Sequence, residues 1–185
     1  MNKTLFFVTL LILSAAASAM AADTKANTEL VERGKMLVTF GGCNDCHTPK
    51  TFTPQGPVFD TTRLFSGSAA KQNTPPVDKR ALEPGYWMLM SGDLQTFVGP
   101  WGVSYAANLT PDEQTGIGLW TEDIFVKTLR TGKHMGEGRP LLPPMFTQGF
   151  TALPDSDLKA IYAYLRSLPP IKNAVPAPIA PPDVK

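Results

Sequence analysis

Residues 43–47 read Cys-Asn-Asp-Cys-His, and Cys43 and Cys46 are the only cysteines in the 185-residue chain. C-x-x-C-H is the attachment signature of a c-type haem. Two intervening residues place both sulfurs on one helical turn, where they can form thioethers with the two vinyl groups at one edge of a porphyrin. His47 follows directly, which brings its imidazole under the iron as the proximal ligand. The motif therefore predicts one covalent haem held by Cys43, Cys46 and His47.

Three other interpretations of the cysteine pair compete with this one. A zinc site takes about four Cys or His ligands, so it would need both cysteines and both histidines, His47 and His134. A thioredoxin-like pair follows a strand in a β-α-β unit, whereas the residues before Cys43 have a helical pattern. A structural disulfide across two residues would be short and strained. The sequence favours haem attachment over all three.

The first 22 residues have the pattern of a secretory signal peptide. Lys3 precedes an apolar run from Leu5 to Leu13, and small residues follow through Ala22. The run is shorter than the about 20 residues that span a bilayer. We expect cleavage near Ala21 or Ala22, a periplasmic location and no membrane span after cleavage; a retained N-terminal anchor is the alternative.

Composition limits the class of protein. Without the leader, the chain of about 160 residues has the size of one domain. The hydrophobic content of the full sequence, 43%, is that of an ordinary globular protein. Loss of Lys3 takes the formal net charge from +1 to zero, so no nucleic-acid partner is implied. The 18 prolines and 15 glycines predict long loops. We expect a domain over residues 23–168 and a separate tail over residues 169–185.

The first predicted helix runs from Thr28 to Phe40, where apolar residues recur with helical spacing. Gly34 in its middle costs about 1 kcal/mol against alanine, which indicates either a break or the close approach of another element. A second helix is predicted from Thr121, whose hydroxyl can cap it, to Arg130 before a glycine. Its core-facing residues would be Ile124, Phe125 and Leu129.

A third helix is predicted after Pro154, with Asp155 as its cap and an end before the prolines at 169 and 170. Its apolar residues at i, i+3, i+4 and i+7 are Leu158, Ile161, Tyr162 and Leu165. Between the haem motif and residue 121 the sequence predicts loops and one small β-hairpin, with strands at 87–90 and 94–98. The segment 63–86 has no assignment. Six prolines make residues 169–185 an extended, polyproline-like tail that is disordered or lies along a partner.

The second axial ligand of the iron decides between an electron carrier and a ligand-binding haem. Met145 follows two prolines in the sequence Leu141-Leu142-Pro143-Pro144, which restrict the loop and can hold a side chain in place. Met145 is therefore the preferred distal ligand, and Met135 and His134 remain alternatives.

A resemblance to a known family adds to these inferences. The sequences Asn108-Leu109-Thr110-Pro111-Asp112, Thr115-Gly116-Ile117-Gly118-Leu119-Trp120 and Leu142-Pro143-Pro144-Met145 resemble class I c-type cytochromes, in particular the cytochrome c domains of bacterial periplasmic dehydrogenase cytochrome subunits. The resemblance, over residues 28–168, implies an all-α, cytochrome c-like fold around one covalent haem c. It implies that the terminal helices cross with Gly34 and Phe40 against Tyr162 and Leu165, and that Met145 is the distal ligand.

Two weaker site residues follow from the same resemblance. Gly56-Pro57 resembles the family's Gly-Pro pair, whose proline carbonyl accepts a hydrogen bond from Nδ1 of the proximal histidine, here His47. Trp120 resembles a residue packed near the haem, although an aromatic beside a helix is more often ordinary core.

The function expected from the residues and the resemblance is single-electron transfer by a monohaem protein that is not itself an enzyme. Its redox partners would be a dehydrogenase as donor and a cytochrome or oxidase as acceptor. A basic face for docking is expected in residues 50–80, from Lys50, Arg63, Lys71, Lys79 and Arg80. Two alternatives stay open. One is a gas sensor or peroxidase-like protein with an open or displaceable sixth site, and the other is a permanently bound cytochrome subunit of a dehydrogenase complex, with the tail as docking element.

Overall fold

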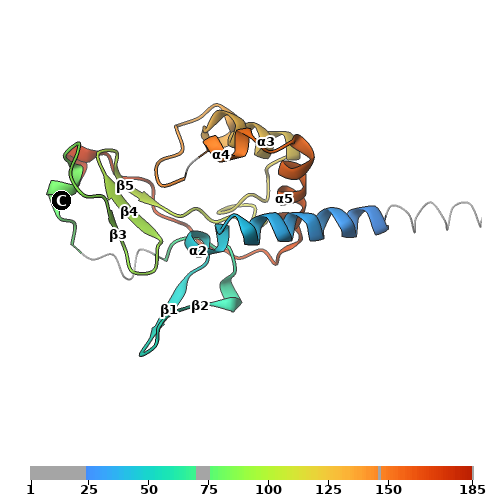
Figure 1. The fold of residues 1–185 in the computed structure, drawn as a ribbon, viewed down its shortest axis with the longest axis horizontal. Coiled ribbons are helices and arrows are strands. Elements are labelled where there is room, and N and C mark those ends of the chain that lie inside the picture. Colours follow the sequence, from blue (N-terminus) through green and yellow to red (C-terminus); the bar gives the residue numbers. More distant parts are fainter. Residues whose placement is uncertain (1–23, 70–75, 146, 185) are drawn as a thin grey trace, which may run out of the picture.

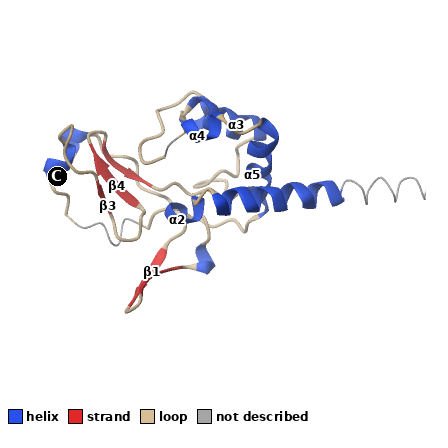
Figure 2. Cartoon of the chain, in the orientation of Figure 1, coloured by secondary structure: helices blue, strands red, loops and turns tan. Residues whose placement is uncertain are grey.

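The computed structural model describes residues 24–69, 76–145 and 147–184, so the predicted signal peptide lies outside the described residues. A helical part on one side of the molecule joins a part built from strands and loops on the other (Figure 1). Figure 2 shows the helices in blue and the strands in red. None of the described helices combines the length and apolar character needed to cross a bilayer. The strands make the fold helical with small antiparallel sheets rather than all-α.

The helical part consists of a long N-terminal helix, helical from residue 24 to residue 40, and four further α-helices. These are α2 (Cys43–His47), α3 (Glu122–Thr131), α4 (Gln148–Thr151) and α5 (Asp155–Ser167). Short 3-10 turns lie between the larger elements: η1 (Thr61–Arg63), η2 (Lys79–Leu82), η3 (His134–Gly136) and η4 (Pro181–Asp183). The three helices predicted from sequence are all present.

The N-terminal helix crosses α5 at Gly34. A Cβ added to Gly34 would lie 1.9 Å from the carbonyl oxygen of Ala160 and 2.8 Å from Cβ of Tyr164, so the two backbones approach more closely than any side chain allows. The guanidinium of Arg33 adds two hydrogen bonds to the Asp157 carboxylate, at 2.9 and 2.8 Å. Gly34 thus marks a close approach and not a break.

Two details of the predicted crossing are wrong. Phe40 is 90% exposed, whereas Val38, four residues after Gly34 and so on the same helical face, is buried. On α5 it is Tyr164 that contacts the N-terminal helix. Tyr162 lies beside Phe125 of α3 instead, with 5.4 Å between the ring centroids.

The caps of α3 follow the sequence prediction, and that of α5 does not. The Thr121 hydroxyl accepts the backbone N–H of Ile124, and Gly132 ends α3 in the left-handed region at φ 64°. In α5, Pro154 occupies the N-cap position and Asp155 is the first helical residue, without a side-chain cap. The Asp155 carboxylate instead accepts a hydrogen bond from Arg130 at 2.6 Å, which ties α5 to α3.

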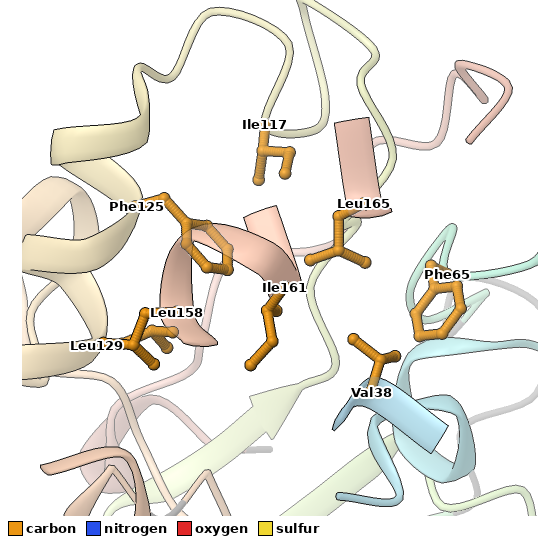
Figure 3. Close-up of a cluster of buried hydrophobic side chains, with 8 residues drawn as sticks. All are labelled: Val38, Phe65, Ile117, Phe125, Leu129, Leu158, Ile161 and Leu165. Atoms are coloured by element: carbon orange, nitrogen blue, oxygen red, sulfur yellow. The ribbon is translucent and has the colours of Figure 1, made fainter. Parts of the chain in front are cut away.

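One buried cluster holds these helices together (Figure 3). It joins Val38 of the N-terminal helix and Phe65 to residues from the loop before α3, from α3 and from α5, namely Ile117, Phe125, Leu129, Leu158, Ile161 and Leu165. All eight are less than a tenth exposed. Ile124, which was expected to face the core, is only partly buried.

The strands form two small antiparallel sheets. Strands β1 (Lys50–Thr53) and β2 (Gly56–Phe59) make a hairpin directly after the haem motif. Strands β3 (Leu89–Met90), β4 (Thr96–Gly99) and β5 (Gly102–Tyr105) form the second sheet in that order. The predicted hairpin corresponds to β3 and β4, with Leu89 opposite Val98. The β1–β2 hairpin and β5 were not predicted.

The proline-rich C-terminal segment returns along the molecule from α5 to the three-stranded sheet (Figure 1). Ile179 exchanges two backbone hydrogen bonds of 2.9 Å with Val103 of β5. Val184 is buried against Ala81 and Val98. The prediction that residues 169–185 are disordered or lie along a partner is therefore wrong for the described residues, 169–184, which pack on the chain's own surface.

Candidate haem-binding site

The two cysteines lie on the single turn of α2. Gly42 starts this turn in the left-handed region, at φ 64°. Both thiols are free and partly buried, and burial raises the pKa of each. Cys43 packs against the central cluster. One helical turn therefore carries both free thiols, and Cys43 places its sulfur against the apolar core.

His47 ends α2, and its ring is oriented by a distant backbone carbonyl. Nδ1 lies 2.7 Å from the carbonyl oxygen of Ala107, sixty residues later in the chain. Since a carbonyl only accepts, Nδ1 carries the proton and Nε2 keeps its lone pair for a metal. Loss of solvent around the ring lowers the pKa of His47, which favours this neutral form. The imidazole therefore has the tautomer and orientation that ligation of a metal through Nε2 requires.

The predicted role of Pro57 is therefore wrong. Pro57 lies exposed in β2, paired with Phe52 across the hairpin. The hairpin points this segment away from α2, and Ala107 supplies the carbonyl instead. No local sequence signal marks Ala107, because a backbone acceptor can come from any residue type.

Met145 sits in the loop between α3 and α4. The loop has a cis bond between Pro143 and Pro144, and the Ser104 hydroxyl donates to the Pro143 carbonyl at 2.6 Å. The contact attaches the loop to strand β5, which continues toward Ala107. Met145 is partly buried and packs against the same central cluster as Cys43. The elements that carry the two predicted iron ligands, His47 and Met145, are thus linked through β5.

Trp120 also packs against the central cluster, so three predicted site residues, Cys43, Met145 and Trp120, meet at one core. The Tyr162 hydroxyl donates to the Trp120 carbonyl at 2.5 Å. The Trp120 ring stacks edge-to-face with the ring of His134, at 5.4 Å between centroids. His134 is exposed otherwise, and Met135 is 46% exposed at φ 53°. Of the two alternative ligands, His134 thus lies beside Trp120, and Met135 follows it in the turn η3.

The expected basic face is largely neutralised. Arg63 and Arg80 form ion pairs with Asp60 and Asp78, at 2.8 and 2.7 Å. Lys50 donates to the backbone carbonyl of Asp45 and, at 2.6 Å, to that of Asp93. Lys71 lies outside the described residues, and Lys79 is exposed. Lys50 thus links α2 to the turn before β4 rather than presenting its charge to a partner.

Residues 43–47 and 145 fit a haem by the chemistry of their donors. A C-x-x-C-H turn with two free thiols would supply both thioether sulfurs. An imidazole already bonded at Nδ1 would supply one axial ligand, and the partly buried thioether of Met145 is a candidate for the other. Among the described residues no three His, Cys, Asp or Glu side chains gather into an alternative metal site.

Comparisons with known proteins give the following similarities. The chain is 30% identical over 165 residues, 89% of its length, to the gluconate 2-dehydrogenase cytochrome c subunit of Pantoea cypripedii. It is 29% identical over 148 residues, 80% of its length, to one of the subunits of nicotinate dehydrogenase from Pseudomonas putida. It is 39% identical over 66 residues, 36% of its length, to the fructose dehydrogenase cytochrome subunit of Gluconobacter japonicus. The matches cover 29%, 9% and 13% of these proteins, so the chain spans less than a third of each. No protein-family model matches the chain.

Proposed function

Because this chain is similar to the cytochrome subunits of dehydrogenases, we propose that it is a periplasmic monohaem cytochrome c that passes single electrons from a dehydrogenase to a downstream acceptor. Cys43 and Cys46 hold the haem covalently, and His47 and Met145 ligate its iron. The bound haem supplies a one-electron Fe(III)/Fe(II) couple. The protein is the electron-transfer component and the dehydrogenase the catalyst.

The observation that carries the proposal is the hydrogen bond between His47 Nδ1 and the Ala107 carbonyl. It fixes the imidazole tautomer and leaves Nε2 for iron, directly after two free thiols on the same turn. A redox disulfide requires neither the oriented imidazole nor the partly buried methionine that packs on the same core. A zinc site would also orient its histidine, but it needs about four ligands, and no three His, Cys, Asp or Glu side chains gather among the described residues.

The residues around the site have separate tasks. The central cluster excludes water from one side of the site, and exclusion of water disfavours the extra charge of ferric iron and raises the potential. The two prolines before Met145 and the Ser104 contact hold the methionine loop in one place. Because neither ligand leaves during electron transfer, the geometry changes little and the reorganisation energy stays small.

A visible spectrum tests the proposal. The full chain is expressed in a host that attaches c-type haem, and oxidised and reduced spectra are recorded for the parent and for Met145→Ala. We expect a weak far-red band from sulfur bound to ferric iron in the parent and its loss in Met145→Ala. Met135→Ala and His134→Ala serve as matched controls and should keep the band. A parent without covalent haem, or a high-spin spectrum that shifts with carbon monoxide, would refute the His/Met carrier.

A second candidate function is that of a permanent subunit in a dehydrogenase complex, which the names of the relatives favour. The part of the structure built from strands exposes three large apolar side chains, Trp87, Met88 and Met90, at 76, 62 and 66%. Such a patch suits a protein contact. Co-purification of a native partner with the full chain, compared with Trp87→Ser, tests it: a partner that is lost from the variant supports the subunit. Deleting residues 169–185 is unsuitable here, because the described part of that segment packs on the domain itself.

A further inference from the structure

We propose that Gln95 and Asn173 are positioning residues for His47: they hold the loop that fixes the Ala107 carbonyl on the imidazole, and so set the reduction potential of the iron. The inference rests on the proposed haem function. Neither residue belongs to the haem motif or to the methionine loop.

The loop in question is residues 66–68, which lies between α2 and the segment that follows β5. The backbone N–H of Gly67 donates to the carbonyl of His47 at 2.8 Å, and that of Ser68 donates to the carbonyl of Ala106 at 2.8 Å. A Cβ on Gly67, which has φ 78°, would lie 2.6 Å from the carbonyl carbon of Ala107. The loop therefore touches the His47 backbone on one side and the Ala107 peptide on the other, and its position decides where the Ala107 carbonyl points.

Gln95 holds the loop from the side of the sheet. The side chain is 1% exposed, and its Nε2 donates to the Gly67 carbonyl at 3.1 Å and to the Cys46 carbonyl at 3.4 Å. Its Oε1 accepts the backbone N–H of Ala69 at 3.2 Å. Its own backbone carbonyl accepts from Ala106 at 3.0 Å. The buried side chain of Gln95 thus links the C-x-x-C-H turn to the loop, and the backbone of the same residue links both to the segment that carries Ala107.

Asn173 holds the loop from the opposite side, in the C-terminal segment. Its Nδ2 donates to the carbonyls of Ser66 and Ser68, at 2.7 and 3.0 Å. Its backbone N–H donates to the Thr115 hydroxyl at 3.0 Å. The Asn108 side chain, next to Ala107, donates to the Ile171 carbonyl at 2.8 Å. The C-terminal segment is therefore hydrogen-bonded both to the loop at residues 66–68 and to Asn108, the residue that follows Ala107.

The chemical consequence has a definite sign. A hydrogen bond from Nδ1–H to a carbonyl raises the basicity of the ligating imidazole. A more basic ligand favours Fe(III), so a weaker bond between His47 and Ala107 raises the potential. General loosening of the fold acts the other way, because water at the haem stabilises the charge of Fe(III) and lowers the potential. The direction of the change therefore separates a positioning role from a merely structural one.

The test compares Asn173→Ala and Gln95→Ala with the parent, all in the haem-loaded full chain. The control is Ser66→Ala, because the buried Ser66 hydroxyl has no hydrogen-bond partner among the described residues and its removal leaves the Asn173 contacts in place. Two quantities are measured: the reduction potential by redox titration, and the nitrogen and proton shifts of His47 Nδ1–H by NMR. Asn173 is only partly buried, so Asn173→Ala should disturb the fold less than Gln95→Ala. If Gln95→Ala does not fold, Asn173→Ala alone still tests the inference.

We expect the ratio of reduced to oxidised protein at a fixed ambient potential to rise about threefold or more in Asn173→Ala, which is about 30 mV for a one-electron couple. The Nδ1–H proton should move upfield, and Ser66→Ala should match the parent in both quantities. The inference would be overturned if a variant that carries haem showed an unchanged or lowered reduction potential, or an unmoved Nδ1–H signal. That result would leave the proposed function intact. A parent without covalent haem would overturn the proposed function instead.

Discussion

Gly34→Ala is the sharpest test of the helix crossing. The added Cβ would lie 1.9 Å from the carbonyl oxygen and 2.5 Å from the carbonyl carbon of Ala160. Ordinary contact needs about 3.5 Å, so the two helices must separate by about 1.5 Å. Both contacted atoms are backbone and cannot rotate away, which puts the strain near the upper end of the about 1–3 kcal/mol typical of overpacking. Alanine has a higher helix propensity than glycine, which offsets about 1 kcal/mol of this strain. The net loss of unfolding free energy is then about 2 kcal/mol.

The assay is thermal unfolding of the haem-loaded chain, followed by far-UV circular dichroism. A loss of about 2 kcal/mol lowers Tm by about 4–8 °C in a chain of this size. Gly149→Ala is the matched control, since Gly149 lies inside α4 with nothing within 4 Å of an added Cβ. It should leave Tm unchanged or raise it slightly. Equal behaviour of the two variants would refute the close approach at Gly34.

Two further predictions concern the helix ends. Thr121→Ala removes the hydroxyl that accepts the Ile124 N–H and should cost about 1 kcal/mol of unfolding free energy, measured by urea denaturation; Thr121→Ser should recover most of it, and equal stability of all three proteins would contradict the cap. The hydrogen bond from Arg33 lowers the pKa of Asp157, so the carboxylate contributes stability above its unfolded pKa of about 3.9, and that contribution is lost as the pH falls through the folded pKa. The urea midpoints of the parent and Asp157→Asn should therefore differ at pH 7, and the difference should shrink as the pH is lowered below about 3.9. A difference that does not depend on pH would count against this ion pair.

The sequence predicts best what is encoded locally. Thr121 and Gly132 mark the ends of α3 by their own chemistry, and helical spacing identifies the buried residues Leu158, Ile161 and Leu165 of α5. Gly34 reports a close approach because no side chain would be tolerated there. The resemblance implied Phe40 at the crossing, whereas the four-residue spacing from Gly34 selects Val38, which is the buried residue.

Contacts between backbone groups that are far apart in the chain have no comparable signal in the sequence. The acceptor for His47 is the carbonyl of Ala107, which every residue type could provide. Polyproline composition in residues 169–185 indicated an extended conformation, and the described segment has few regular elements, but composition does not say what an extended segment lies against. The hydrogen bonds between Ile179 and β5 are formed by backbone groups, which any residue type provides. The carbonyl that orients the haem ligand and the segment that supports it could therefore be found only in three dimensions.

The hydrogen bonds from Asn173 to the carbonyls of Ser66 and Ser68 also affect the expected order of events during folding. Asn173 and Ser66 are 107 residues apart, and closing a loop costs more conformational entropy as it lengthens, by about 0.6 kcal/mol for each doubling. We therefore expect this contact to form late, after shorter-range contacts have brought the two segments together. On the proposed function, covalent attachment of the haem would need only the turn at residues 43–47. Acquiring the cofactor and acquiring its final electronic environment would then be separate events, and the second would wait for nearly the last part of the described chain to dock.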